Sequence, residues 1–113
     1  MRIFVFILFL SAQCFAGIIQ DIFNFPNPFS KSTTVDITLS QSSDVEIRIY
    51  NLSGDLVRKE NIANVESYRY EWKWKGKNDN NMDVADGIYI LAVVVKEGGS
   101  IKEVKMRKVA VLR

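Results

Sequence analysis

The chain has 113 residues and a formal charge of +2, because 15 lysine and arginine residues stand against 13 aspartate and glutamate residues. That length predicts one domain, and so small a net charge argues against nucleic-acid binding. The sequence has no histidine and a single cysteine, which argues against serine–histidine and cysteine–histidine catalysis and against zinc sites built from these ligands. We therefore expect a protein that is not an enzyme and uses no cofactor.

Residues 1–16 have the features of a secretory signal peptide. Arg2 precedes an unbroken apolar run from Ile3 to Leu10, and a small residue follows at Ala16. The run is shorter than the roughly 20 apolar residues that cross a bilayer, so we expect cleavage and no stable membrane span. An uncleaved anchor and lipidation of Cys14 are less favoured alternatives. The mature protein is expected in the periplasm, at the cell surface or outside the cell, without a disulfide.

A linker segment, residues 17–32, is predicted to join the signal to the domain, and no strand is predicted within it. It contains the motif Pro26, Asn27, Pro28 and Phe29. Proline fixes its own φ and pushes the preceding residue toward extended geometry, so the motif predicts a stiff, extended lead-in to a strand. We expect Phe25 and Phe29 to cover the open end of the domain.

Residues 33–113 show the two-residue periodicity of β-strands with one buried face. Val35, Ile37 and Leu39 alternate with polar residues, for example. Strands are predicted at 33–39, 45–49, 56–59, 68–74, 88–95 and 102–112. The short spacing and the lack of an amphipathic helix predict an all-β fold, an immunoglobulin-like antiparallel β-sandwich of about seven strands.

Glycines mark the predicted turns. Gly54 lies in a turn sequence, and Gly98–Gly99 predicts a hairpin between the last two strands. Gly87 precedes the most apolar segment, 88–95, where positive φ or a close backbone approach is the expected reason for glycine. That segment predicts a central strand that is covered on both faces or carries an exposed apolar stripe. Tyr89 is expected to pack over a close turn.

Four aromatic rings alternate with charged residues in the segment 68–74; they are Tyr68, Tyr70, Trp72 and Trp74. A pleated strand places all four on one face, and we expect that face to belong to the core, because a domain without disulfides needs the burial. The alternative is a flat platform on which sugars stack.

The segment Asn78–Asp83 is rich in side-chain oxygens. It resembles a calcium loop, since calcium prefers carboxylate and carbonyl ligands. However, it lacks the glycine and the distal glutamate of the EF-hand pattern. We therefore favour a connection built on Asx turns, with calcium binding as the open alternative.

Five segments, in this order and spacing, resemble the FlgD-type immunoglobulin-like domain and the closely similar C-terminal sorting domain of type IX secretion. They are residues 25–29, 32–39, 45–58, 72–91 and 105–113. The resemblance covers 25–113 and gives structural motif positions at Gly54, Trp74, Gly76, Gly87 and Tyr89, beside the proline motif. It implies a sandwich that normally ends a larger secreted protein, is recognised by an export machinery and is exchanged for a surface attachment.

The leading hypothesis is therefore a sorting or surface-attachment domain that acts through protein partners. A small assembly or adhesion subunit, like the hook-capping module, and a carbohydrate-binding module are the alternatives. The last strand is expected at an edge, where strand addition could read a basic face made of Lys105, Arg107, Lys108 and Arg113. The signal directly adjoins the domain, which suggests a minimal module or a remnant of a longer protein and leaves the oligomeric state open.

Overall fold

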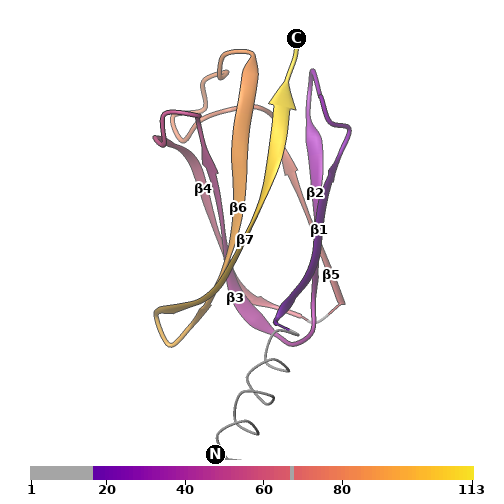
Figure 1. The fold of residues 1–113 in the computed structure, drawn as a ribbon, viewed down its shortest axis with the longest axis vertical. Coiled ribbons are helices and arrows are strands. Elements are labelled where there is room, and N and C mark those ends of the chain that lie inside the picture. Colours follow the sequence, from indigo (N-terminus) through magenta and orange to yellow (C-terminus); the bar gives the residue numbers. More distant parts are fainter. Residues whose placement is uncertain (1–16, 67) are drawn as a thin grey trace, which may run out of the picture.

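The computed structural model describes residues 17–66 and 68–113 and shows two antiparallel sheets packed face to face (Figure 1). The three-stranded sheet contains, in spatial order, β1 (Ile19–Phe25), β2 (Thr33–Leu39) and β5 (Tyr68–Trp74). The four-stranded sheet contains, in spatial order, β4 (Leu56–Val65), β3 (Ser43–Tyr50), β6 (Gly87–Glu97) and β7 (Ser100–Val111). The predicted β-sandwich is thus confirmed.

The described residues contain no helix, and so none that could cross a membrane. The predicted signal peptide lies outside these residues.

β1 is a strand that the sequence pattern did not predict. It lies before residue 33, where the predicted sandwich begins, yet it pairs along its length with β2. Its two buried side chains, Ile19 and Ile22, are three positions apart because the register shifts between Ile19 and Asp21. Such a bulge breaks the two-residue alternation that reveals a strand, so the ladder adds Ile19–Phe25 to the sandwich.

β4 is longer than predicted. The predicted return strand of the hairpin covers only residues 56–59, whereas the strand runs to Val65. β4 is an edge strand, pairs only with β3, and has a register shift near each end. Few of its side chains reach the core, so apolar and polar residues do not alternate regularly and the periodic signal is weak.

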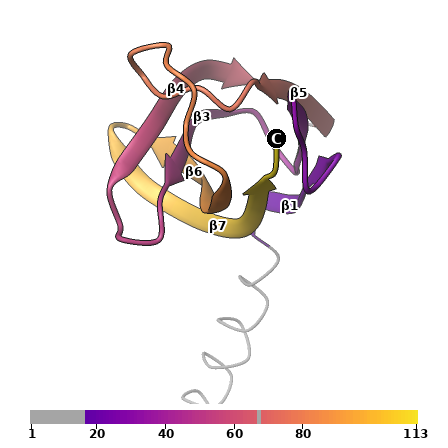
Figure 2. The same cartoon turned by 90° about the horizontal axis from the view of Figure 1, so that it is seen from above.

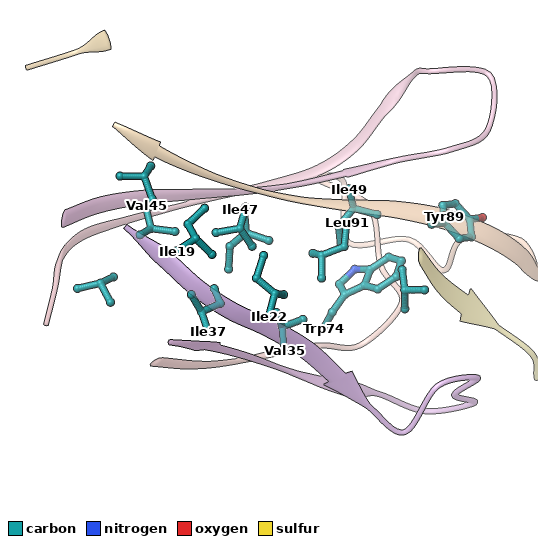
Figure 3. Packing of buried hydrophobic residues seen from close by; sticks show 14 of the residues in the cluster. Ile19, Ile22, Val35, Ile37, Val45, Ile47, Ile49, Trp74, Tyr89 and Leu91 are labelled. Carbon is teal, nitrogen blue, oxygen red and sulfur yellow. The ribbon is translucent and has the colours of Figure 1, made fainter. Parts of the chain in front are cut away.

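The core lies between the two sheets and is filled by the alternate residues of facing strands (Figure 3). Fully buried members include Val35, Ile37, Ile47, Ile49 and Leu91. Burial of each such side chain contributes about 1.5–3 kcal/mol. The apolar core can therefore hold the sandwich together without a crosslink.

β6 is the central strand of its sheet and is covered on both faces, as one reading of its apolar run predicted. Its odd-numbered residues from Leu91 to Val95 face the core. Ala92 and Val94 lie on the opposite face, yet only 2% and 1% of their surface is exposed. Ala92 pairs with Arg48 on β3 and Met106 on β7, and Val94 pairs with Glu46 and Val104, so each small residue lies between the side chains of two neighbouring strands.

The two sides of the sandwich differ. Seen along the long axis, β7 runs beside β1, while β4 and β5 lie on the opposite side (Figure 2). Side chains of β7 connect it to β1 and the residue before β1. The Glu103 carboxylate accepts a hydrogen bond from the backbone N–H of Ile18 at 2.6 Å. Lys105 and Arg107 donate to the carbonyl oxygens of Ile19 and Ile22 at 3.3 and 3.2 Å.

Candidate interaction surface

The proline motif closes the end of the β7 edge. The side-chain oxygen of Asn27 accepts from the Ala110 N–H at 2.9 Å, and its amide donates to the Lys108 carbonyl at 3.1 Å. Phe29 continues the pairing through its backbone. Its N–H donates to the Ala110 carbonyl at 3.0 Å, and its carbonyl accepts from the Leu112 N–H at 2.9 Å. We call Asn27 and Phe29, with these four bonds, the edge clamp. Residues 26–28 form bends that carry the chain across the end of β7, instead of the extended lead-in that the sequence predicted.

Three aromatic rings fill the end of the sandwich beneath the clamp. The ring of Trp74 meets the rings of Phe29 and Tyr89 edge to face, at 5.5 and 5.8 Å between centroids. The indole N–H donates to the Lys77 carbonyl, and the Tyr89 hydroxyl donates to the Ala85 carbonyl at 2.6 Å. Phe29 and Tyr89 thus lie where the sequence suggested, but Phe25 is 71% exposed and covers nothing.

Two glycines fix the backbone around this cluster. Gly87 has φ +150°, which agrees with the expectation of positive φ. Gly76 has φ +71°, and a Cβ there would lie 2.5 Å from the guanidinium of Arg113. That guanidinium donates to the carbonyl oxygens of Gly76 and Val84 at 3.0 and 2.6 Å, so Gly76 makes room for Arg113. At the other predicted turn, Gly54 donates its N–H to the Asn51 carbonyl at 3.0 Å.

The four basic residues predicted to form a recognition strand do not share one face. Lys105 and Arg107 reach across to the β1 backbone, and Arg113 is held against the loop that follows β5. Lys108 pairs with Ile90 on the outer face of the four-stranded sheet and is exposed. The edge clamp covers the end of the β7 edge, at Lys108, Ala110 and Leu112, which was expected to be free.

The oxygen-rich loop after β5 is held together by its own hydrogen bonds. The Asn78 side-chain oxygen accepts from the N–H groups of Asn80 and Met82, both at 2.9 Å. Asp83 pairs with Lys77 at 3.1 Å. These bonds are those of an Asx turn, and among the described residues no three His, Cys, Asp or Glu side chains gather as metal ligands.

The same loop covers part of the β4 edge. Asp79 donates its N–H to the Val57 carbonyl at 3.0 Å, and its side chain accepts from the Lys59 N–H at 3.0 Å. The hydrogen bond from Lys59 is the main cause that lowers the pKa of Asp79, and the guanidinium of Arg58 adds to it. The loop therefore pairs with the edge strand much as a short extra strand would.

The burial of the four aromatic rings on β5 decreases from one end of the strand to the other. Trp74 is buried, Tyr70 and Trp72 are half-buried against the core, and Tyr68 is 80% exposed. The core interpretation is therefore right for three rings and wrong for Tyr68. A sugar-stacking platform would need several rings open side by side, which this gradient of burial does not provide. The guanidinium of Arg58 lies 5.8 Å from the Trp72 ring and covers part of it.

A buried carboxylate on the outer face of the four-stranded sheet escaped the sequence analysis. Glu46 is 2% exposed and pairs with Arg48, with Lys96 at 3.4 Å and with Lys59 at 3.8 Å. Burial raises the pKa of Glu46, but the hydrogen bonds and charges of Arg48 and Lys96 outweigh burial and hold that pKa below its usual value. In the sequence Glu46 looks like any outward residue of an alternating strand; only the register places three cations around it.

Three solved structures are similar to this chain. Dimeric latent PorU from Porphyromonas gingivalis aligns with a TM-score of 0.72 and 24% identity, over 81% of this chain and 9% of PorU. FlgD from P. aeruginosa aligns with a TM-score of 0.60 and 18% identity, over 70% of this chain and 60% of FlgD. PorZ is described as an essential surface component of the type IX secretion system of P. gingivalis. It aligns with a TM-score of 0.51 and 26% identity, over 81% of this chain and 11% of PorZ.

These likenesses support the fold, and this chain spans less than two thirds of each of the three proteins. A search of curated proteins gave no match. The family model of the FlgD Ig-like domain matches residues 27–99, from the edge clamp through β6. Since this match covers more than half of the sequence, the chain belongs to the FlgD Ig-like domain family.

Proposed function

We propose that this chain is a non-catalytic, exported module that acts through protein contacts, as a sorting or surface-attachment domain of a type IX secretion system. The observation that carries the proposal is the match to PorU, in which 81% of this chain corresponds to 9% of a much larger protein. PorZ, a surface component of that secretion system, contains a similar segment in 11% of its length. The sandwich is thus a module that larger proteins contain, and one of them is a component of this secretion system.

The outer face of β7 is the surface that we assign to the export machinery. The end of the β7 edge is covered from within the chain, so strand addition there would first have to displace the clamp. On the outer face, Lys108 is exposed and Met106, two positions before it, is 57% exposed. Met106 is the kind of flexible apolar side chain that is enriched at protein contacts, and Lys108 places a positive charge beside it.

Localisation of a fusion protein tests the proposal. Residues 17–113 are fused to the C-terminus of a periplasmic reporter and expressed in a bacterium that has type IX machinery, and in a strain of it without the secretion pore. We expect the reporter at the cell surface or in the medium of the first strain only. Accumulation of a folded reporter in the periplasm of both strains would refute the sorting role.

A matched pair of charge reversals locates the contact surface. Lys108→Glu changes the proposed face, while Lys31→Glu changes an exposed lysine in the connection before β2. We expect Lys108→Glu to lower the exported fraction and Lys31→Glu to leave it unchanged, with equal circular dichroism spectra for both. Equal export of the two variants would show that this face is not read.

A structural assembly subunit is the second candidate function. The likeness to FlgD favours it, and so do the apolar side chains on the outer face of the four-stranded sheet, since Ile88, Val104 and Met106 are each more than 40% exposed. Light scattering over a concentration series tests this role. Assembly predicts a mass that rises with concentration, and a constant monomer mass together with failure to capture a partner would count against it.

A further inference from the structure

The outer edge of β5 is open. β5 pairs with β2 along Tyr68–Trp74 on one side, and the three-stranded sheet ends there. Beyond that ladder, none of the hydrogen bonds among residues 17–66 and 68–113 uses a backbone atom of β5. The strand therefore presents a row of unpaired N–H and C=O groups to its surroundings.

This openness contrasts with the other edges of the sandwich. The edge clamp covers the end of β7, and side chains of β7 bind the edge of β1. The loop after β5 covers part of β4 through Asp79. Natural proteins usually cover or blunt their sheet edges in such ways, and β5 is a seven-residue strand without such a cover.

A basic groove runs beside the open edge. Its walls include Arg58, Lys73, Lys75 and Lys77, against one carboxylate, Asp79. Arg58 and Lys77 are paired with acidic residues, but Lys73 and Lys75 are exposed and make no ion pair with other described residues. The half-buried ring of Trp72 gives the groove an apolar wall.

The charge of this groove decides what can occupy it. A second copy would bring its own Lys73 and Lys75 to the same edge, and lysines on an edge strand oppose such pairing. A strand that carries carboxylates would instead be attracted to these lysines. Lys73 lies on β5 and Lys75 directly follows its last residue, so a peptide that extends past the end of β5 with an acidic residue at every second position can place one carboxylate near each ammonium group.

We propose that the free edge of β5 binds an extended acidic peptide segment of a partner protein by strand addition. The unpaired backbone of β5 supplies the hydrogen bonds, and Lys73 and Lys75 select acidic side chains. This inference goes beyond the sorting role and does not depend on it, because the edge of β5 and the outer face of β7 are separate surfaces.

Titration calorimetry at low salt tests the charge selection. The probe is a capped octapeptide of alternating valine and glutamate, added to the purified 17–113 sandwich, and the control peptide alternates valine and lysine. We expect binding of the glutamate peptide only. The double variant Lys73→Glu/Lys75→Glu should bind it about tenfold more weakly, the effect of two cross-strand charge pairs turned from attraction to repulsion, and should now bind the lysine peptide.

Lys31→Glu/Lys102→Glu is the matched control, since it makes the same charge change at exposed lysines away from the groove. It should bind like the wild type. If both double variants weakened peptide binding equally, the effect would come from the net charge of the protein and not from Lys73 and Lys75, and the proposal would be overturned. Failure of the wild type to bind the glutamate peptide would overturn it as well.

N-methylation of the peptide tests the backbone pairing. Only one edge of an added strand faces β5, so methyl groups on one set of alternate amides should abolish binding, and those on the other set should be tolerated. Tolerance of both sets would exclude strand addition. Self-association of the sandwich that Lys73→Glu/Lys75→Glu changes would show that a second copy, and not an acidic peptide, occupies the edge.

Discussion

Replacing Asn27 by alanine removes the side chain of the edge clamp. Two hydrogen bonds are lost, the one from the Ala110 N–H at 2.9 Å and the one to the Lys108 carbonyl at 3.1 Å. A typical hydrogen bond contributes about 0.5–1.5 kcal/mol to stability. Both bonds are solvent-accessible, so the groups left behind can bond to water, and we expect the free energy of unfolding to fall by about 1–2 kcal/mol.

Urea unfolding followed by circular dichroism measures this loss. For a domain of this size it corresponds to a decrease of roughly 4–16 °C in the melting temperature. Asn80→Ala is the matched control, because Asn80 is an exposed loop residue that takes part in the Asx turn through its backbone. If Asn27→Ala cost no more stability than Asn80→Ala, the clamp would not stabilise the β7 edge and this reasoning would be refuted.

Three further predictions concern the core, the backbone and pH. Trp74→Ala should lower the unfolding free energy by about 3–5 kcal/mol, whereas Tyr68→Ala at the exposed end of the same strand should change it by less than about 0.5 kcal/mol; equal losses in urea unfolding would contradict this burial gradient. Gly76→Ala should destabilise and release Arg113, seen as faster proteolysis of the chain end, because the new Cβ would meet its guanidinium; an unchanged end would disprove that contact. The pKa of Glu46 is lower in the folded state, so its contribution to stability is complete above the usual value of 4.5 and is lost as pH falls through the folded value. The stability advantage of the wild type over Glu46→Gln should therefore shrink as pH falls below 4.5, and an advantage independent of pH would contradict the assignment.

The strands that face the core were predictable because their pattern is local. Val35, Ile37 and Leu39 alternate with polar residues and all three are buried. The Gly98–Gly99 turn was predictable for the same reason, since two adjacent glycines with positive φ suit a tight hairpin.

The parts that escaped prediction depend on pairings between distant residues. Asn27 binds Ala110, which lies 83 positions later, and a side chain that imitates a backbone amide leaves no periodic signal. The same holds for the cations around Glu46, which three different strands supply. Whether an edge is open or covered follows only from the assembled sandwich, so the sequence placed the recognition surface on the edge of β7.

Amide hydrogen exchange of the 17–113 sandwich tests the central structural claim most directly. The claim is that Asn27 and Phe29 close the end of the β7 edge, whereas the β5 edge stays open. We predict slow exchange at the N–H groups of Ala110 and Leu112, and fast exchange at the outward-facing alternate amides of β5. Exchange at Ala110 and Leu112 as fast as at those β5 amides would contradict the account.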